Sequence, residues 1–272
     1  MKRIFIISSI CAILCNYTTI VAQTVSYTNH ELHMQYYNMR VKSMEEFMDR
    51  FNGVKVTPGI EASDSMFRQK NIVSLIADNY VKKMDDISKA RVENFINEAV
   101  YSGTFLDFKN SIWYADVSCG GTYQGKKISL HIILKPEKIK DEVYRWSIVD
   151  VDGLQEAGLI DTTQWRTISP VEHEVSFIEM LQFLENEPQN ALGMRSKSKE
   201  VDQLSYFWGL LHEKHLKINQ CESIGFYIFD VPGYVFHVSE DNTIQSHSGM
   251  LIDSVEKISD QFDPITEIKD RI

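Results

Sequence analysis

The sequence predicts an α+β protein in which helices cover an antiparallel β-sheet. Two observations support this prediction. Apolar residues recur every three or four positions through residues 31–51, 72–80 and 88–100, which is typical of helices. From residue 111 the apolar residues alternate instead, which is typical of strands that bury one face. A second, smaller unit, in which helices again precede strands, begins near residue 165.

The N-terminus has the three parts of a secretory signal peptide. Lys2 and Arg3 precede an apolar run over residues 4–15, and Ala22 is a small residue suited to cleavage. The run is shorter than the roughly 20 residues that span a bilayer. We therefore expect residues 1–22 to be removed and the protein to be exported to the periplasm or the cell exterior, with no stable membrane span.

A lipid anchor is the alternative fate of this segment, because Cys11 and Cys15 lie within it. A bulky residue, Ile10 or Leu14, precedes each cysteine, whereas lipoprotein cleavage usually requires a small residue there. Ordinary cleavage is therefore the favoured prediction.

The charge of the chain excludes one class of partner. The predicted mature chain of 250 residues (272 − 22) carries 26 Lys+Arg and 38 Asp+Glu, a formal charge of −12. A surface of this sign repels phosphate backbones, so no nucleic acid is expected as a main partner. The length suits one large domain or two small ones.

In the first half, three helices are expected before the sheet. The first covers residues 31–51 and ends at Asn52-Gly53, where glycine can take the left-handed conformation. Residues 72–80 mark a second, short helix. Ser88 is expected to cap the third helix, because a serine hydroxyl can accept a hydrogen bond from a backbone amide in the first turn of a helix.

Three strands are then expected, over residues 111–119, 127–135 and 144–151. Pro136 should end the second strand because it cannot donate a ladder hydrogen bond, and Asp152-Gly153 should end the third. The short connections predict an antiparallel meander.

The second half repeats this order in a shorter form. Helices are expected over residues 171–184 and 200–215, and the final residues 259–272 read as a polar tail. The strands are expected over residues 216–221, 223–231 and 234–239, with a further short strand near 250–252.

Two stretches of the first half resemble exported NTF2-like proteins of Bacteroides-type bacteria. Residues 39–53 (MRVKSMEEFMDRFNG) resemble the first helix of that group, and residues 68–76 (RQKNIVSLI) resemble its second short helix. The expected strands fall where that fold has its curved sheet. The resemblance implies an NTF2-like domain over residues 31–153. The second α+β unit over residues 165–258 is predicted from its pattern alone, as either a degenerate copy of that domain or a small α+β appendage.

The resemblance also implies a cone-shaped pocket that holds a substrate, a peptide or nothing known, so the fold alone does not assign an activity. Four polar residues of the expected strands could face such a pocket. Asp116 and His131 are the candidate catalytic pair, because a carboxylate beside a histidine orients the ring and makes it a general base. Tyr114 and Asp150 are further pocket candidates. The alternation itself favours the other interpretation, in which Asp116 and His131 face solvent on the polar side of the sheet.

Two cysteines remain after the predicted cleavage, Cys119 and Cys221. They form a disulfide or stay as two buried thiols. An exported protein can keep a disulfide, and closing a loop of about 100 residues contributes about 4–5 kcal/mol in the chain-entropy model.

Metal and cofactor motifs are incomplete. His212 and His215 share one side of a helix, but no third ligand accompanies them, so a capping role at the helix C-terminus is expected. Residues 150–153 (DVDG) begin like a calcium loop, yet Leu154 occupies the fifth position. We predict no metal and no cofactor.

The leading functional prediction is an exported, non-catalytic binding or interaction module whose partner is a protein, a peptide or a small molecule. One alternative is an isomerase or hydrolase that uses Asp116 and His131 for acid–base chemistry. The other is an assembly subunit, such as a homodimer, that pairs through an exposed apolar sheet face.

Overall fold

The computed structural model describes residues 40–141, 143–154, 157, 203–242 and 248–272. The predicted signal peptide and the predicted helix over residues 171–184 lie outside these residues. The chain divides into two compact units. Unit 1 comprises residues 1–108 and 238–255, and unit 2 comprises residues 109–237 and 256–272. This division differs from the predicted sequential halves, because each unit is built from two segments that are separate in the sequence.

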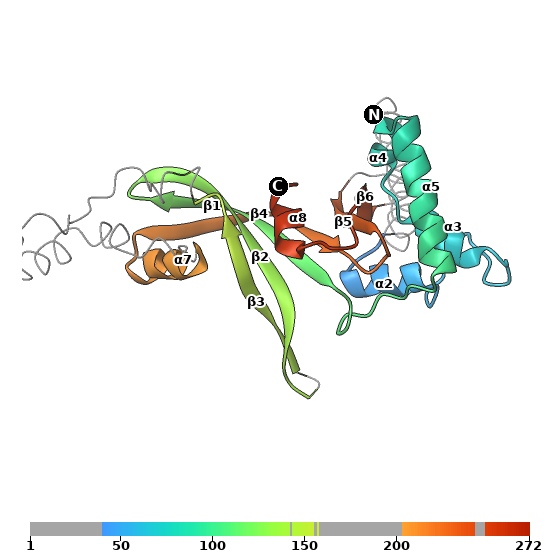
Figure 1. Cartoon of the computed structure of the whole chain (residues 1–272), viewed down its shortest axis with the longest axis horizontal. Coiled ribbons are helices and arrows are strands. Elements are labelled where there is room, and N and C mark those ends of the chain that lie inside the picture. The colour runs from blue at the N-terminus through green and yellow to red at the C-terminus, as the bar shows by residue number, and fades with distance from the viewer. Residues whose placement is uncertain (1–39, 142, 155–156, 158–202, 243–247) are drawn as a thin grey trace, which may run out of the picture. The chain divides into compact units, whose positions relative to one another are not determined.

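Among the described elements, a group of helices is followed by two groups of strands, with one helix between the groups of strands and one after them (Figure 1). The helices are α2 (Met44–Asn52), α3 (Phe67–Ser74), α4 (Asp78–Lys83), α5 (Asp86–Tyr101), α7 (Gln203–His212) and α8 (Pro264–Lys269). The strands are β1 (Trp113–Tyr123), β2 (Lys126–Lys140), β3 (Val143–Asp152), β4 (Leu216–Ile228), β5 (Tyr234–Asp241) and β6 (Gly249–Lys257).

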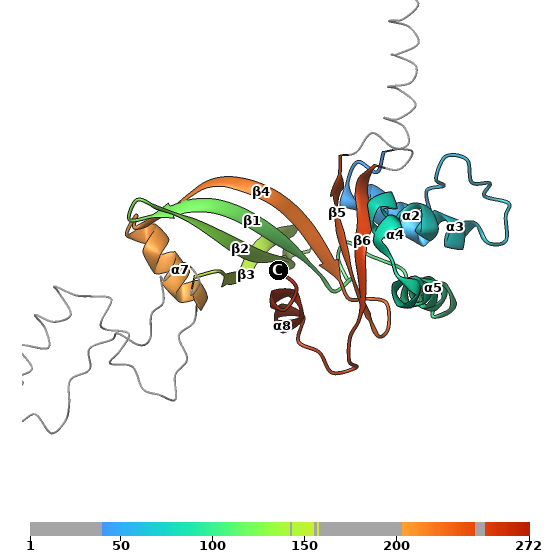
Figure 2. The ribbon, with the colours of Figure 1, turned by 90° about the horizontal axis from the view of Figure 1, so that it is seen from above.

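The strands form one six-stranded antiparallel sheet in the order β3-β2-β1-β4-β5-β6. The predicted α+β class is therefore confirmed, and so is a curved antiparallel sheet; Figure 2 shows the bend of β1 and β4. The strands that were expected in two successive groups lie in this single sheet, because β1 pairs with β4 from Trp113↔Ile228 to Tyr123↔Leu216. No helix of the described residues is long and apolar enough to cross a bilayer.

Helix α2 is bounded by the residues that its sequence favours. The Ser43 side chain caps the N-terminus by accepting from the amide of Glu46, and Gly53 ends the helix with φ +74°. The predicted end at Asn52-Gly53 is therefore confirmed. At α5, Asp85 accepts from the amide of Ser88, so the cap lies three residues before the predicted one.

The core of unit 1 is built on phenylalanines. The Phe47 ring stacks on Phe51 with centroids 6.2 Å apart, and Phe51 lies 6.5 Å from Phe95. All three are fully buried, as are Ile72 and Leu75 of the next helix. Burial of such side chains stabilises the unit by about 2–3 kcal/mol each.

The sheet of unit 2 has two faces with different chemistry. Residues that alternate along a strand share a face. Asp116 and its register partners Ile133 and Gly225 lie on what we call the Asp116 face. Cys119 and its partners Leu130 and Cys221 lie on the opposite side, the Cys119 face.

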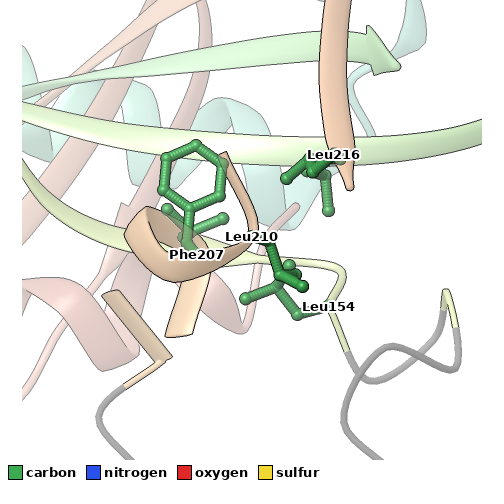
Figure 3. Close-up of a cluster of buried hydrophobic side chains, with 6 residues drawn as sticks. Leu154, Phe207, Leu210 and Leu216 are labelled. Atoms are coloured by element: carbon green, nitrogen blue, oxygen red, sulfur yellow. The ribbon is translucent and has the colours of Figure 1, made fainter. Parts of the chain in front are cut away.

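Helix α7 packs on the Cys119 face. Phe207 and Leu210 of α7 are buried against Leu154 and Leu216, which lie at the ends of β3 and β4 (Figure 3). Leu130 of β2 completes the contact. The helix therefore covers the end of the sheet where its apolar residues cluster.

Helix α8 packs on the Asp116 face and corrects the prediction of a polar tail over residues 259–272. Asp263 caps the helix by accepting from the amide of Thr266 at 2.9 Å, and Pro264 occupies its first turn. Ile268 is fully buried in a cluster that includes Ile133 and Tyr227. A few apolar residues on a short helix were enough to dock the C-terminus.

Pro136 does not end the second strand, because β2 continues to Lys140. The pairing of β2 with β1 stops at Leu134. Pro136 is paired only with Trp146 of β3, on the other edge of β2. One edge of β2 is therefore unpaired at this position, and a residue without an N–H fits there.

Candidate functional site

The predicted pair, Asp116 and His131, is in direct contact. Asp116 lies on β1 opposite Ile133, and His131 lies on β2 opposite Ser118, so the two side chains are diagonal neighbours on one face. His131 Nδ1 is 2.9 Å from Asp116 Oδ1 and 3.1 Å from Oδ2. Strand pairing therefore brings together two groups that are fifteen residues apart in sequence.

Burial distinguishes this pair from a solvated surface contact. The side chain of Asp116 is 11% exposed and that of His131 is 29% exposed. An ionised carboxylate can only accept hydrogen bonds. When Asp116 is ionised and the His131 ring is neutral, the ring therefore carries its proton on Nδ1 and donates a hydrogen bond to Asp116. The lone pair of His131 Nε2 is then the one that could accept a proton from a ligand.

A second histidine, His237, packs on β4 next to the position that pairs with Asp116. Gly225 on β4 is the register partner of Asp116. A Cβ atom on Gly225 would lie 2.0 Å from His237 Nε2, so the β5 histidine occupies the space above the glycine. The His237 ring also contacts Tyr227 with centroids 4.5 Å apart. His237 therefore packs over the β4 neighbour of Asp116, whereas His131 contacts Asp116 itself.

The second pocket candidate, Asp150, is bound to the C-terminal helix. Lys269 Nζ lies 3.1 Å from Asp150 Oδ2 and 3.6 Å from Asp152 Oδ1. The two carboxylates that suggested the start of a calcium loop thus hold an ammonium group from α8. Asp152 faces His131 in the β2–β3 register, so Asp150, Asp152, His131 and Asp116 form one polar band.

The remaining candidate, Tyr114, belongs to the apolar part of the same face. It is 7% exposed and lies in the cluster with Ile268 and Phe229, whose ring it meets edge-on at 6.1 Å. Burial, and secondarily the charge of Asp263, raises the pKa of the Tyr114 hydroxyl. Its position favours packing of α8 over contact with a ligand.

Unit 1 contains a pocket of about 270 Å³ between α4 and one face of the β5–β6 strands. Ser239 and Asp241 alternate along β5, and Leu251 and Asp253 alternate along β6, so each pair faces the same way. The hydroxyl of Ser239 donates to a carboxylate oxygen of Asp253, which joins the two strands. We call this space, lined also by α4, the unit 1 pocket.

Helix α4 forms the wall of the unit 1 pocket. The amide of Ala77 donates to the Ile252 carbonyl at 2.9 Å, and the amide of Val255 donates to the Tyr80 hydroxyl at 3.1 Å, which attaches the start of the helix to β6. Asn79 and Lys83 are four residues apart, so both side chains lie on the side of the helix that lines the pocket.

Among the charged residues that line the unit 1 pocket, acidic side chains outnumber basic ones. Glu240, Asp241 and Asp253 contribute three carboxylates and Lys83 one ammonium group. Arg40 forms an ion pair with Glu240 and donates to Asn242 Oδ1 at 2.9 Å. With both cations counted, these side chains carry a formal charge of −1 (2 − 3).

The two predicted disulfide partners are neighbours in the sheet. Cys119 on β1 and Cys221 on β4 are register partners, and both are free thiols in the structure. Cys119 is buried, whereas Cys221 is exposed. The disulfide stays a prediction, and the alternative of two buried thiols does not fit Cys221.

Part of the Cys119 face remains apolar and exposed among the residues that the structure describes. Trp146 and Ile224 are 43% and 44% exposed, and the Trp146 ring lies edge-on to Trp113 at 5.1 Å. Phe226 contacts both tryptophan rings. Pairing of subunits through this face stays a prediction.

His212 ends α7, whereas His215 lies three residues beyond the helix, so the two rings do not share one helical side as predicted. His212 is the last residue of the helix, and its Nδ1 lies 3.1 Å from Glu213 Oε1. Within the described ranges, no group of three or more His, Cys, Asp or Glu side chains is arranged to hold a metal ion.

No known protein family, curated protein or solved structure matches the chain. The NTF2-like relationship therefore stays a prediction.

Proposed function

We propose that this chain is an exported binding module and that the unit 1 pocket holds its ligand. The observation that carries the proposal is the combination of a concave space of about 270 Å³ with converging charged, amide and hydroxyl groups. A small number of polar groups around a preformed hollow is the usual form of a small-molecule site. Export rests on the predicted signal peptide.

The lining favours a small organic cation that also carries hydroxyl groups. The carboxylates of Asp241 and Asp253 attract positive charge, and the net charge of the whole chain, −10, adds to this attraction. Asn79 and Asn242 have amides that both donate and accept, so they can bind hydroxyl groups in either direction.

Three sugars that differ in charge test the ligand class. Glucosamine, glucose and glucuronate present similar rings with positive, neutral and negative charge. We expect glucosamine to give the strongest saturable shifts in ¹H–¹⁵N spectra, centred on Asn79 and Asp253, and glucuronate the weakest. Equal weak shifts for all three, or shifts centred outside the pocket, would reject the proposal.

A matched pair of variants tests the role of the carboxylates. Asp241→Asn removes one charge from the pocket and should weaken glucosamine binding about tenfold, equivalent to about 1.4 kcal/mol. Asp260→Asn removes the same charge from an exposed position in unit 2 and should leave the affinity unchanged. Equal effects of the two variants would show that only the net charge of the chain matters.

A second candidate function, acid–base catalysis, is favoured by the 2.9 Å contact between His131 and Asp116. The half-exposed ring supplies a basic Nε2 atom, and the buried carboxylate fixes its orientation. The test is a panel of enolisable carbonyl compounds and chromogenic esters. Any turnover should be lost in both His131→Gln and Asp116→Asn and retained in His212→Gln, which alters an exposed histidine of α7.

A further inference from the structure

The strongest additional feature is the register of the two cysteines of unit 2. Cys119 of β1 and Cys221 of β4 are opposed in neighbouring antiparallel strands, and the register shifts on both sides of this pair. Opposed residues of such strands have Cα atoms about 4.5–5.5 Å apart. Disulfides span Cα separations of about 4.4–6.8 Å, so the backbone already provides a suitable separation.

Two glycines beside the pair let the two strands approach closely. The two residues that follow Cys119 are Gly120 and Gly121, and both of these positions are tightly packed against β4. A Cβ atom on Gly121 would lie 2.7 Å from the Lys217 carbonyl oxygen. The absence of side chains here lets β1 and β4 approach closely beside the cysteines.

The two thiols differ in reactivity because they differ in burial. Cys119 is 4% exposed, and burial, followed by the neighbouring Cys221, Asp116 and Glu222, raises the pKa of its thiol. Cys221 is exposed, and its Sγ lies 3.8 Å from the Ser223 carbonyl. An oxidant in solution can therefore reach Cys221 first, while Cys119 stays protected until its partner has reacted.

We propose that Cys119 and Cys221 form a cross-strand disulfide by exchange with a small oxidised disulfide or an oxidised dithiol protein. The Cys221 thiolate attacks the oxidant and forms a mixed disulfide, which releases one thiolate of the oxidant. The Cys119 thiolate then attacks the Cys221 sulfur and releases the second. The two cysteines lose two protons and two electrons, and the oxidant takes up both as two thiols.

The bond links positions that are 102 residues apart in sequence (221 − 119) and crosses the β1–β4 pairing at the centre of the sheet order. It would fix the register of these two strands between the two shifts. Reduced and oxidised protein should therefore differ in resistance to unfolding while sharing the same fold.

The direct test treats the full-length chain with oxidised glutathione, alkylates the remaining thiols and maps the peptides by mass spectrometry without reduction. We expect a Cys119–Cys221 linked peptide and the loss of alkylation at both positions. The map separates these peptides from those that contain Cys11 and Cys15. Glutathione retained on Cys221 together with a free Cys119 would overturn the proposal.

Two single variants separate bond formation from simple reactivity. Cys119→Ser should retain glutathione on Cys221, because the second exchange cannot occur. Cys221→Ser should leave Cys119 unmodified in the folded protein. Oxidation should raise the denaturant midpoint of the parent chain, and a reductant should reverse the shift. A shift of the same size in either single variant would contradict the assignment.

Discussion

At the scale of single residues, the buried charge of Glu46 is surrounded by donors. Arg50 Nη2 lies 2.6 Å and Lys55 Nζ 2.8 Å from Glu46 Oε1, and the Lys42 amide donates to Oε2 at 3.2 Å. Burial raises the pKa of this carboxyl, but the hydrogen bonds from Lys55, Lys42 and Arg50 outweigh it. The net pKa lies below the usual value of 4.5. Glu46 is thus held in its ionised form.

Glu46→Gln should lower the free energy of unfolding by about 3 kcal/mol at neutral pH, because it removes the carboxylate that pairs with the buried Arg50. A carboxyl with a lowered pKa stabilises the fold above the unfolded value and loses this effect as pH falls through the folded value. The difference from the parent chain should therefore shrink below pH 4.5. Denaturant unfolding at several pH values measures this, and exposed Glu45→Gln should change little.

Gly225 has a steric role beside Asp116. Gly225→Ala would place a Cβ atom 2.0 Å from His237 Nε2 and 2.7 Å from its Cε1, so the ring must move. We expect the free energy of unfolding, measured with denaturant, to fall by about 1–3 kcal/mol, as it does at other overpacked positions. In Gly225→Ala/His237→Ala, part of that loss should be recovered.

Gly209→Ala is the control for this substitution. Gly209 lies in α7, and an added Cβ atom would have no neighbour within 4 Å. Alanine favours a helix over glycine by about 1 kcal/mol, so this variant should be slightly more stable than the parent. If Gly225→Ala were equally harmless, His237 would not be packed over the glycine.

At the scale of elements, α8 depends on one buried side chain. Ile268→Ala removes a fully buried residue from the cluster with Ile133 and Val235 and should cost about 3 kcal/mol. Amide exchange should become faster in α8 and in the covered part of β1 and β2. Ile272→Ala changes an exposed position and should have almost no effect on either measurement.

The strands near Asp116 were predictable because their pattern is local. Alternation from residue 111 assigned Asp116 and His131 to the same side of neighbouring strands, and the antiparallel register brings them into contact. Only a tertiary contact explains α8, because Ile265 and Ile268 lie in a polar segment too short to show a helical period.

At the scale of the whole molecule, the missed site residues depend on pairing between distant segments. His237 lies over Gly225, the register partner of Asp116, only because β4 and β5 follow β1 in the sheet order. The unit 1 pocket joins α4 to strands more than 150 residues later in the chain. The predicted strands ended at residues 239 and 252, so Asp241 and Asp253 lay outside them, and nothing local related these residues to Asn79.

The predicted domain over residues 31–153 should not fold as an independent unit. It lacks β4, so the edge of β1 from Trp113 to Tyr123 would lose its partner strand. We expect this fragment to aggregate or to show poorly dispersed amide resonances, whereas residues 23–272 should unfold cooperatively. A monomeric fragment with dispersed resonances would contradict this expectation.

Unit 1 begins with the first helices and is completed only by residues 238–255. Parallel bridges join Val41 to Gly249 and Ile76 to Ile252, so the early segments acquire these neighbours late in synthesis. A growing polypeptide emerges from the ribosome at about 5–20 residues per second. Val41 and Ile76, which flank these helices, therefore lack their final neighbours for many seconds, and a chaperone that shields these apolar residues during that interval would improve the yield of native protein.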